Sequence, residues 1–466
     1  MSLPCDIVIL AAGRGSRLPG DVPKPLLPLA GEPLIGHVLR AAATLRPRRT
    51  VIVTAAKSDA LKAFAQTVCP QAEFVTQHPP HGTADAARCG INTLDDDGAT
   101  LILCADTPLL EAATLRKLHT KASGLALMAF HAHNPQGYGR VLRKNGNIIG
   151  IVEEKDASPT VRKITEVFAG ALAAPTIWLK QTLRRVRDNN AAGERYLTDL
   201  AALAAKQTLP ITAVPTNEYE AAGVNTAMDL AAAETMLRQR RTTALLTRGA
   251  LLIDPLRVDV RGQVRAAAGT IIDVNVVLIG KITLGHGCYI GAHSVLTDCA
   301  IGAGTVIEPF CHLHGARIGT NCTIGPYARI RPNTALATKV HVGNFVEIKN
   351  SHLAAGTKAG HLSYLGDSDI GNEVNIGAGV ITCNYDGKRK HRTVIGNNAF
   401  IGSDTQLIAP VRIGKGAFVA AGTTVTKDAP TNHLTMARLP QQSRPLRKTQ
   451  TVKKSKKKKQ FTEGHN

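Results

Sequence analysis

Beyond residue 250, bulky aliphatic residues, many of them followed by glycine, recur about every six residues. The frame runs from Leu284 to Ile348, and it resumes at Leu365 and again at Ile395 after two interruptions. A sustained six-residue period is typical of a parallel β-helix, in which each aliphatic side chain points into the coil and small residues occupy the corners. The sequence therefore predicts a hexapeptide-repeat β-helix over residues 250–430.

Four cysteines in this repeat raise the question of a metal cluster. Each precedes an inward-facing aliphatic by two residues: Cys288, Cys299, Cys311 and Cys322. If three hexads make one coil, Cys288 and Cys322 share a face but lie two coils apart, which is too far for a disulfide. We expect all four to be packing residues. The odd total of nine cysteines, without a Cys-x-x-Cys pair, favours reduced thiols in a cytoplasmic protein.

Residues 1–225 have a different texture, in which short apolar runs alternate with amphipathic stretches. Three runs are predicted to be buried strands and two stretches helices: Ile7–Leu10, Thr50–Val53 and Leu101–Leu103, with Pro33–Thr44 and Ser58–Thr67. This alternation predicts a largely parallel, Rossmann-like α/β sheet covered on both faces. Residues 226–249 are expected to form a linker helix, because Thr226–Arg248 contains no proline or glycine.

About nine of the 21 net positive charges of the chain lie in its last residues, from Arg438 onward. From Arg438 onward there are ten basic residues against the single acid Glu463. We expect residues 431–466 to be a disordered basic tail that is mainly solubilising, with loose binding to a polyanion as the alternative. Aromatic residues make up only 4% of the chain, so specific nucleic-acid recognition is not expected. Neither a membrane-spanning run nor a signal peptide is evident, which also favours the cytoplasm.

A phosphate-binding pattern follows the first predicted strand. Glycines in Leu10-Ala11-Ala12-Gly13-Arg14-Gly15-Ser16-Arg17 allow backbone N–H groups to face a phosphate chain, and Arg17 and Lys24 would neutralise its charge. Asp106 ends another apolar run, at the strand edge where ligands of α/β sheets bind.

This pattern resembles the signature of the sugar-nucleotide pyrophosphorylases, and further motifs agree in order: Gln77 with Gly82-Thr83, Gly137–Arg140, Ile151–Lys155 and Gly223–Asn225. The resemblance implies a site that binds UTP and a sugar phosphate, with Asp106 and Asn225 holding Mg²⁺ and Glu153 receiving the sugar. The implied nucleotide- and sugar-binding residues are Leu10, Ala11, Ala12, Gly13, Arg17, Lys24, Gln77, Gly82, Thr83, Asp106, Gly139, Glu153 and Asn225.

Four positions depart from the pattern of these enzymes. Phe168 stands where the uridylyltransferases carry an asparagine that contacts the sugar, and Cys104-Ala105 replaces Tyr-Gly before Asp106. Ala227 stands where arginine is expected. A phenyl ring cannot replace an amide hydrogen bond. An altered sugar or nucleotide specificity is therefore an alternative, and a degenerate regulatory domain is another.

The two interruptions of the hexad frame, around Lys349–Leu365 and Thr382–Arg392, carry a second set of motifs. Val342–Lys349, Lys358–Asp367, Asn375–Gly379 and Thr382–Gly387 resemble the acetyltransferase half of the bifunctional GlmU family, and with the N-terminal motifs the resemblance covers roughly residues 5–440. Acetylation of an amine needs a base, and an imidazole suits that task. We assign His361 as this base.

The resemblance implies a left-handed β-helix, a homotrimer, and an enzyme that acetylates glucosamine 1-phosphate with acetyl-CoA. The same enzyme would then transfer UMP from UTP to the acetylated sugar, giving UDP-N-acetylglucosamine. Arg331 and Lys349 would bind the sugar phosphate. The rest of the sugar pocket would be Tyr364, Asn375, Asn384 and Tyr385, and the acetyl-CoA site would be Ala378, Ser403, Ala421 and Arg438. A zinc carbonic anhydrase on the same repeat is the remaining alternative, with His312 and His314 as ligands but no evident third histidine.

Overall fold

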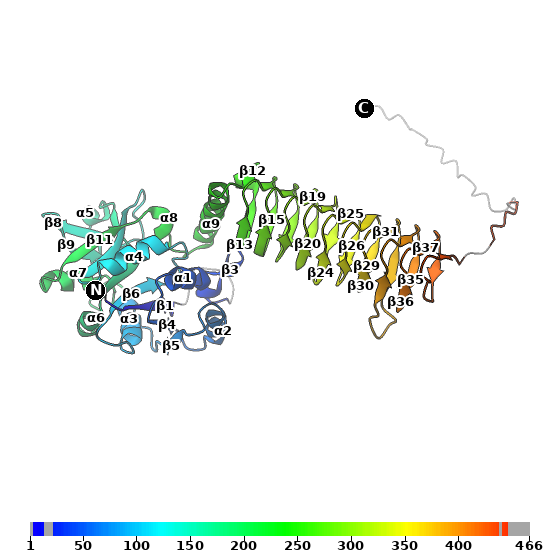
Figure 1. The fold of residues 1–466 in the computed structure, drawn as a ribbon. Helices are drawn as coiled ribbons and strands as arrows, with labels where there is room; N and C mark the ends of the chain where they lie inside the picture. Colours follow the sequence, from blue (N-terminus) through cyan, green and yellow to red (C-terminus); the bar gives the residue numbers. More distant parts are fainter. Residues whose placement is uncertain (1–2, 14–21, 438–439, 446–466) are drawn as a thin grey trace, which may run out of the picture.

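The computed structural model describes residues 3–13, 22–437 and 440–445. The chain folds into an N-terminal α/β domain and a rod-like β-helix, and helix α9 lies between them (Figure 1). Among the described residues, no helix combines the length and the apolar character needed to cross a membrane.

The N-terminal domain is built on a nine-stranded sheet with the order β11-β7-β10-β6-β1-β4-β5 and a β8–β9 hairpin at β10. Its strands are β1 Cys5–Ala11, β4 Arg49–Thr54, β5 Glu73–Thr76, β6 Ala99–Cys104, β7 Leu125–His131, β8 Arg140–Lys144, β9 Asn147–Val152, β10 Glu166–Pro175 and β11 Ile211–Pro215. β1 is parallel to both of its neighbours, β4 and β6, whereas β10 is antiparallel to β6 and β7. The three predicted strands are confirmed within β1, β4 and β6.

Helices cover both faces of this sheet, as predicted, because the strands are apolar on both sides. The helices are α1 Leu34–Ala43, α2 Asp59–Val68, α3 Thr83–Ile91, α4 Ala112–Thr120, α5 Pro159–Arg162, α6 Thr176–Leu183, α7 Asp199–Lys206 and α8 Glu218–Ala221, with the 3-10 turns η1 Lys24–Leu26 and η2 Glu154–Asp156. A short hairpin, β2 Pro28–Leu29 and β3 Glu32–Pro33, lies outside the sheet.

The long helix predicted over Thr226–Arg248 is present as α9 (Ala227–Thr247). It begins with a capping box in which the Thr226 side chain accepts from the Asp229 backbone N–H and the Asp229 side chain accepts from that of Thr226. It stops before Gly249, whose φ of 89° is incompatible with a continuing helix.

The hexad repeat forms a parallel β-helix, as predicted. One face is an eleven-stranded sheet of β12 Leu251–Leu252, β14 Ile271–Ile272, β16 Tyr289–Ile290, β19 Val306–Ile307, β22 Thr323–Ile324, β25 His341–Asn344, β28 Lys358–His361, β31 Asn375–Ile376, β34 Phe400–Ile401, β37 Phe418–Val419 and β39 Leu434–Thr435.

The other two faces form one seventeen-stranded sheet, because β13 Asp259–Ala266 and β15 Val277–Leu284 bend across both. Its second face continues as β17 Val295–Thr297, β20 His312–His314, β23 Arg329–Ile330, β26 Glu347–Lys349, β29 Tyr364–Gly366, β32 Ile381–Cys383, β35 Gln406–Ile408 and β38 Thr424–Val425. Its third face continues as β18 Ala300–Ile301, β21 Ala316–Ile318, β24 Thr334–Leu336, β27 His352–Leu353, β30 Ser368–Ile370, β33 Thr393–Ile395 and β36 Val411–Ile413.

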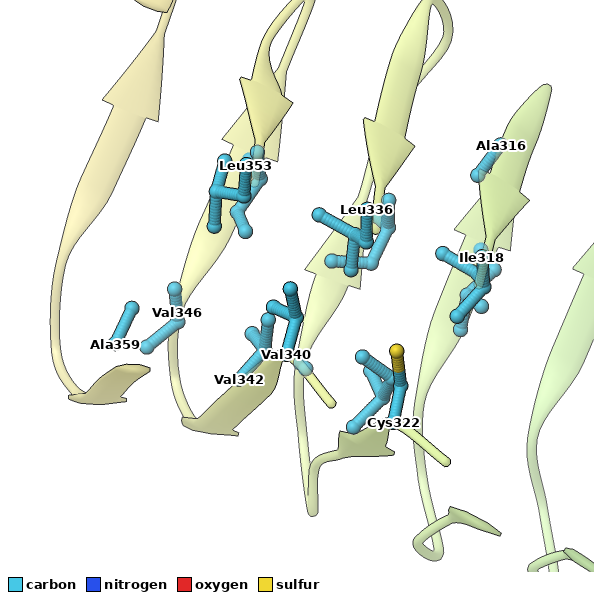
Figure 2. Packing of buried hydrophobic residues seen from close by; sticks show 14 of the residues in the cluster. Ala316, Ile318, Cys322, Leu336, Val340, Val342, Val346, Leu353 and Ala359 are labelled. Atoms are coloured by element: carbon cyan, nitrogen blue, oxygen red, sulfur yellow. The ribbon is translucent and has the colours of Figure 1, made fainter. Parts of the chain in front are cut away.

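The interior of the β-helix is a continuous stack of aliphatic side chains, one from each face in every coil. Figure 2 shows Ile318, Leu336 and Leu353 in successive coils, with Cys322 packed among the other interior residues. Cys288, Cys299, Cys311 and Cys322 are all buried free thiols, so their predicted packing role is confirmed. A coil cannot bury its apolar face alone, which makes each rung depend on its neighbours.

Candidate active sites

The first candidate site lies where two parallel strands end side by side. Leu10 near the end of β1 pairs with Cys104 at the end of β6, and the Ala105 backbone N–H donates to the Leu10 carbonyl at 3.0 Å. The segment that ends at Gly13 and the segment that contains Asp106 therefore leave the sheet at the same edge, as the sequence predicted.

Lys24 joins the two predicted magnesium ligands at this edge. Its Nζ donates to Asp106 Oδ2 at 2.5 Å and to Asn225 Oδ1 at 2.8 Å. A carboxylate oxygen and an amide oxygen thus converge on one cation. Oxygen ligands of this kind suit Mg²⁺, which is typically held by one or two carboxylates together with water and substrate phosphates. The donor set fits the implied metal.

Two hollows of about 410 and 430 Å³ meet at this point. Asp106 and Asn225 line both of them. The first is also lined by Leu10, Ala11, Ala12, Gly13, Lys24, Gln77, Gly82 and Thr83, and the second by Thr83, Gly139, Glu153 and Thr198. Every nucleotide- or sugar-binding residue predicted from the sequence is therefore at one of the hollows, except Arg17, which lies outside the described residues.

The loop before α3 forms one wall of the first hollow and is held by side-chain hydrogen bonds. Gln77 is buried and donates through Nε2 to the Gly82 carbonyl at 3.1 Å and to Asp85 Oδ2 at 3.0 Å. Gly82 has a φ of 105°, and a Cβ there would lie 2.6 Å from the Arg195 carbonyl oxygen. Only glycine fits this turn.

The second hollow combines a buried carboxyl with an apolar wall. Glu153 accepts a hydrogen bond from Thr198 Oγ1 at 2.9 Å, and burial raises its pKa. The apolar wall comes from β10, whose pairing with β7 is irregular between Phe168 and Leu172. Gly170, within this irregular stretch, has a φ of 78°. Phe168 is 8% exposed and lines the hollow, so the departure noted in the sequence lies in the wall of the predicted sugar pocket.

The second candidate site lies along one edge of the β-helix. The turn after each strand of the eleven-stranded sheet places one residue on this edge in each coil, two positions after the inward-facing residue. Successive coils contribute Asn344, His361, Ala378, Ser403 and Ala421. Backbone hydrogen bonds tie the rungs, for example Asp404 N–H to the Ala378 carbonyl at 2.7 Å and Gly422 N–H to the Ser403 carbonyl at 2.8 Å. The predicted base and three predicted acetyl-CoA residues therefore form one track; Arg438 lies outside the described residues.

Asn344 orients the imidazole of His361. The two residues pair across β25 and β28, and His361 Nδ1 lies 2.8 Å from Asn344 Oδ1. Because an amide oxygen can only accept, Nδ1 carries the hydrogen and the lone pair is on Nε2. This tautomer leaves Nε2 free to accept a proton. Asn344 was not among the predicted site residues, although it follows Gly343 just as His361 follows Gly360 one coil later.

Three cationic side chains converge on the face next to this edge. Arg331 donates to Glu347 Oε1 at 2.7 Å, and Lys349 is on the strand that carries Glu347. The pKa of Lys349 is lowered mainly by the neighbouring Lys390 ammonium and to a smaller extent by the positive charge of Arg331. A phosphate dianion would relieve this repulsion. Lys390 belongs to the loop that interrupts the hexad frame, and that interruption was the only sequence signal for it.

The same loop presents Asn384 and Tyr385. Asn384 donates to Asp367, which also accepts from Asn350 at 2.5 Å, and Tyr385 Oη donates to the Gly387 carbonyl at 2.6 Å. Gly366 lies beneath Tyr364 and Asn384, since a Cβ there would be 2.8 Å from Asn384 Nδ2. Tyr364 and Asn384 are thus brought together.

One predicted sugar-pocket residue and one pair of predicted metal ligands are not part of this cluster. Asn375 is on β31 of the eleven-stranded sheet, whereas Lys349 and Tyr364 are on the seventeen-stranded sheet. The structure therefore does not bring Asn375 to the other sugar-pocket residues within one copy. His312 and His314 lie on β20, and in the described ranges no three His, Cys, Asp or Glu side chains are grouped as metal ligands.

Comparison with known proteins agrees with both halves of the molecule. Residues 7–209 match the family model of the MobA-like NTP transferase domain, and residues 298–332 and 392–427 match the bacterial transferase hexapeptide repeat. The chain is 48% identical to the bifunctional protein GlmU of Ralstonia nicotianae over 93% of this chain and 96% of that protein. It is 46% identical to the GlmU protein of Bordetella parapertussis, over 95% of this chain and 100% of that protein.

A third relative, the GlmU protein of Aromatoleum aromaticum, is 45% identical over 97% of this chain and 99% of its own length. These similarities span both domains and the helix between them. The chain is therefore a bifunctional enzyme and belongs to the GlmU family.

Proposed function

We propose that the chain makes UDP-N-acetylglucosamine from glucosamine 1-phosphate in two steps, at two separate sites. The observation that carries the proposal is the meeting of two hollows at Asp106 and Asn225, on a chain that also presents an oriented imidazole on its β-helix. The nine free cysteines favour a reducing cytoplasm as the place of the reaction.

In the acetyl-transfer step, the sugar phosphate binds between the basic side chains of Arg331, Lys349 and Lys390, because its negative charge offsets the repulsion that lowers the pKa of Lys349. The amino nitrogen attacks the thioester carbonyl of acetyl-CoA, and the carbon–sulfur bond breaks. His361 Nε2 accepts the proton that the nitrogen loses, because Asn344 holds the hydrogen on Nδ1. Acetyl-CoA lies along the edge track of Ala378, Ser403 and Ala421.

In the uridylyl-transfer step, the nucleotide occupies the first hollow and the acetylated sugar phosphate the second. A phosphate oxygen of the sugar attacks the α-phosphorus of UTP in line, and pyrophosphate leaves. Lys24 neutralises phosphate charge, and Glu153 and the Phe168 wall hold the sugar. Mg²⁺ bound by Asp106 and Asn225 would supply further charge neutralisation at the phosphates. Positioning and electrostatics suffice, without a covalent intermediate.

We also propose that the acetyltransferase works as a homotrimer. His293, Phe310, Tyr327 and Phe345 stack along one corner of the β-helix with ring centroids 4.8, 5.0 and 5.3 Å apart. This ridge is exposed, Phe345 by 56%, and it ends beside Asn344 and His361. An exposed aromatic ridge of this kind is typical of an interface. A second copy packed there could also supply the separated Asn375.

The test of the proposed function is a coupled reaction with the full chain. Glucosamine 1-phosphate, acetyl-CoA, UTP and Mg²⁺ together should yield UDP-N-acetylglucosamine by mass spectrometry. Without UTP the reaction should stop at the acetylated sugar phosphate, and without acetyl-CoA no acetylated product should form. Formation of a different sugar nucleotide would contradict the proposal.

A further inference from the structure

The hairpin that follows Lys24 has a strained tip. Ala30 and Gly31 connect β2 to β3 with φ values of 47° and 83°, a pair of left-handed residues that suits a two-residue hairpin. Such a conformation is costly for alanine, which has a Cβ. The tip therefore needs support from outside the hairpin.

Side chains of helix α9 form hydrogen bonds with both backbone polar groups of Ala30. The Ala30 N–H donates to Glu234 Oε2 at 2.6 Å, and Arg241 Nη1 donates to the Ala30 carbonyl at 3.1 Å. The same Arg241 Nη1 lies 2.7 Å from the carbonyl of Val260 on β13, the strand that opens the seventeen-stranded sheet of the β-helix. Gly31 also touches this strand, because a Cβ there would be 3.2 Å from Arg261 Cβ.

A short series of backbone hydrogen bonds connects the hairpin to Lys24. The Leu27 N–H donates to the Lys24 carbonyl at 3.1 Å, and the Leu34 N–H donates to the Leu27 carbonyl at 3.0 Å, which closes the hairpin at the end nearer Lys24. The hairpin also shares one buried cluster with α9, in which Leu29 packs with Ala233 and Leu237. Movement of the tip would therefore displace the lysine.

The N-terminal end of α9 reaches the same site from the other side. Asn225 immediately precedes the capping residue Thr226, and both of their N–H groups donate to Asp229 Oδ2, at 2.9 and 2.8 Å. The neighbouring Val224 N–H donates to the Asp106 carbonyl at 2.8 Å. One helix thus fixes Asn225 at its start and, through Glu234 and Arg241, the segment that carries Lys24.

We propose that Glu234 and Arg241 are positioning residues for uridylyl transfer, which hold Lys24 against Asp106 and Asn225 from within α9. The proposal rests on the proposed role of Lys24. It makes the junction with the β-helix part of the support of the first site, although the junction touches neither hollow.

The experiment uses full-length Glu234→Met and Arg241→Met, assayed for both activities, because methionine keeps the length of each side chain but removes its hydrogen bonds to Ala30. The kcat of uridylyl transfer should fall about tenfold to a hundredfold, the range expected when a catalytic group is misplaced by about 1 Å. The KM for the sugar phosphate should change less than about twofold, since the second hollow is not touched. Acetyl transfer should be unchanged, and Arg241→Lys should recover part of the kcat.

Arg238→Met on the same helix is the matched control and should retain full activity, because the structure gives Arg238 no hydrogen bond to the hairpin within the described residues. Lys24→Met distinguishes the role of Lys24 itself from the positioning of Lys24 by Glu234 and Arg241. If Lys24→Met is inactive while Glu234→Met and Arg241→Met are fully active, the positioning role is wrong and the proposed function stands. If Lys24→Met is itself active, the proposed role of Lys24 fails. A parallel loss of both activities, or a rise in KM alone, would also overturn the proposal.

Discussion

The two sites of this chain are assembled in opposite ways. At the first, Lys24 and Asn225 meet although 201 positions separate them, and their contact depends on the order of the sheet and the course of α9. At the second, Asn344 and His361 are 17 positions apart, one coil of the β-helix. A solenoid converts a sequence period directly into a row of neighbouring side chains, whereas an α/β site exists only after the whole domain has folded.

This contrast predicts that each site can be damaged without harm to the other. In the β-helix a polar edge residue contacts little beyond its own and the adjacent coil. In the N-terminal domain the strand-end loops are held by long-range contacts that do not involve the edge track. Substitutions that remove one activity and spare the other would demonstrate this independence.

The strongest separation should come from His361→Ala. Loss of the general base should reduce acetyl transfer by about 10²–10⁴-fold, because general-base catalysis contributes that much. Release of CoA thiol measures this step, and pyrophosphate release should stay at the level of the unmodified chain. His352→Ala, on the third face of the β-helix, is the control. Equal loss of both activities would break the two-site description.

Asp106→Ala should give the reverse result. Removal of the carboxylate that binds Lys24 should lower uridylyl transfer by about 10²–10³-fold, as for loss of one electrostatic stabiliser of a transition state. The remaining activity should need more Mg²⁺, which a titration followed by pyrophosphate release would show. Unchanged pyrophosphate release at low Mg²⁺ would remove Asp106 as a metal ligand.

Substitutions of Asn344 sharpen the description of the edge. Asn344→Leu removes the acceptor that fixes the imidazole and should slow acetyl transfer about tenfold to a hundredfold. Asn344→Asp keeps an acceptor but adds a carboxylate that favours the imidazolium form. The acid limb of its pH–rate profile should therefore move to higher pH, and an unmoved profile would show that Asn344 does not act through His361.

The smallest effect is expected at Glu153, where burial raises the pKa of the carboxyl. Between the unfolded pKa and this higher folded value the native state binds more protons, so its free energy of unfolding falls as pH rises. Glu153→Gln should therefore raise the melting temperature at pH 7, by about 2–4 °C if the gain is ~1 kcal/mol. Below about pH 3, well under the ordinary glutamate pKa of about 4.3, both states are protonated and the two melting temperatures should coincide. A variant that is less stable at pH 7 would contradict the assigned burial effect.

The fold was largely predictable because the sequence patterns of both domains extend over only a few neighbouring residues. The hexad frame specifies the β-helix, and apolar runs such as Leu101–Leu103 specify the central strands. The helix of α9 followed from the absence of proline and glycine. What the pattern could not show is which side chains meet across the domain, such as Lys24 with Asp106, or Arg241 with the tip of a hairpin.

A site residue was easier to predict from the sequence when it lies in the hexad repeat than when it lies in a loop outside it. Resemblance to known families supplied most of the residues, but Asn344 and Lys390 were missed. Asn344 could have been found by following the position of His361 to the preceding coil. Lys390 could not, because its loop leaves the repeat and its direction depends on contacts such as those of Asp386 with the Arg389 N–H and His391.

The most direct test of the proposed two-step synthesis is pyrophosphate release with UTP and Mg²⁺ across a panel of sugar 1-phosphates. We expect strong preference for N-acetylglucosamine 1-phosphate over glucosamine 1-phosphate and other sugars, with Phe168 accommodated in the wall of the second hollow. Preference for another sugar, or no pyrophosphate release with any of them, would contradict it.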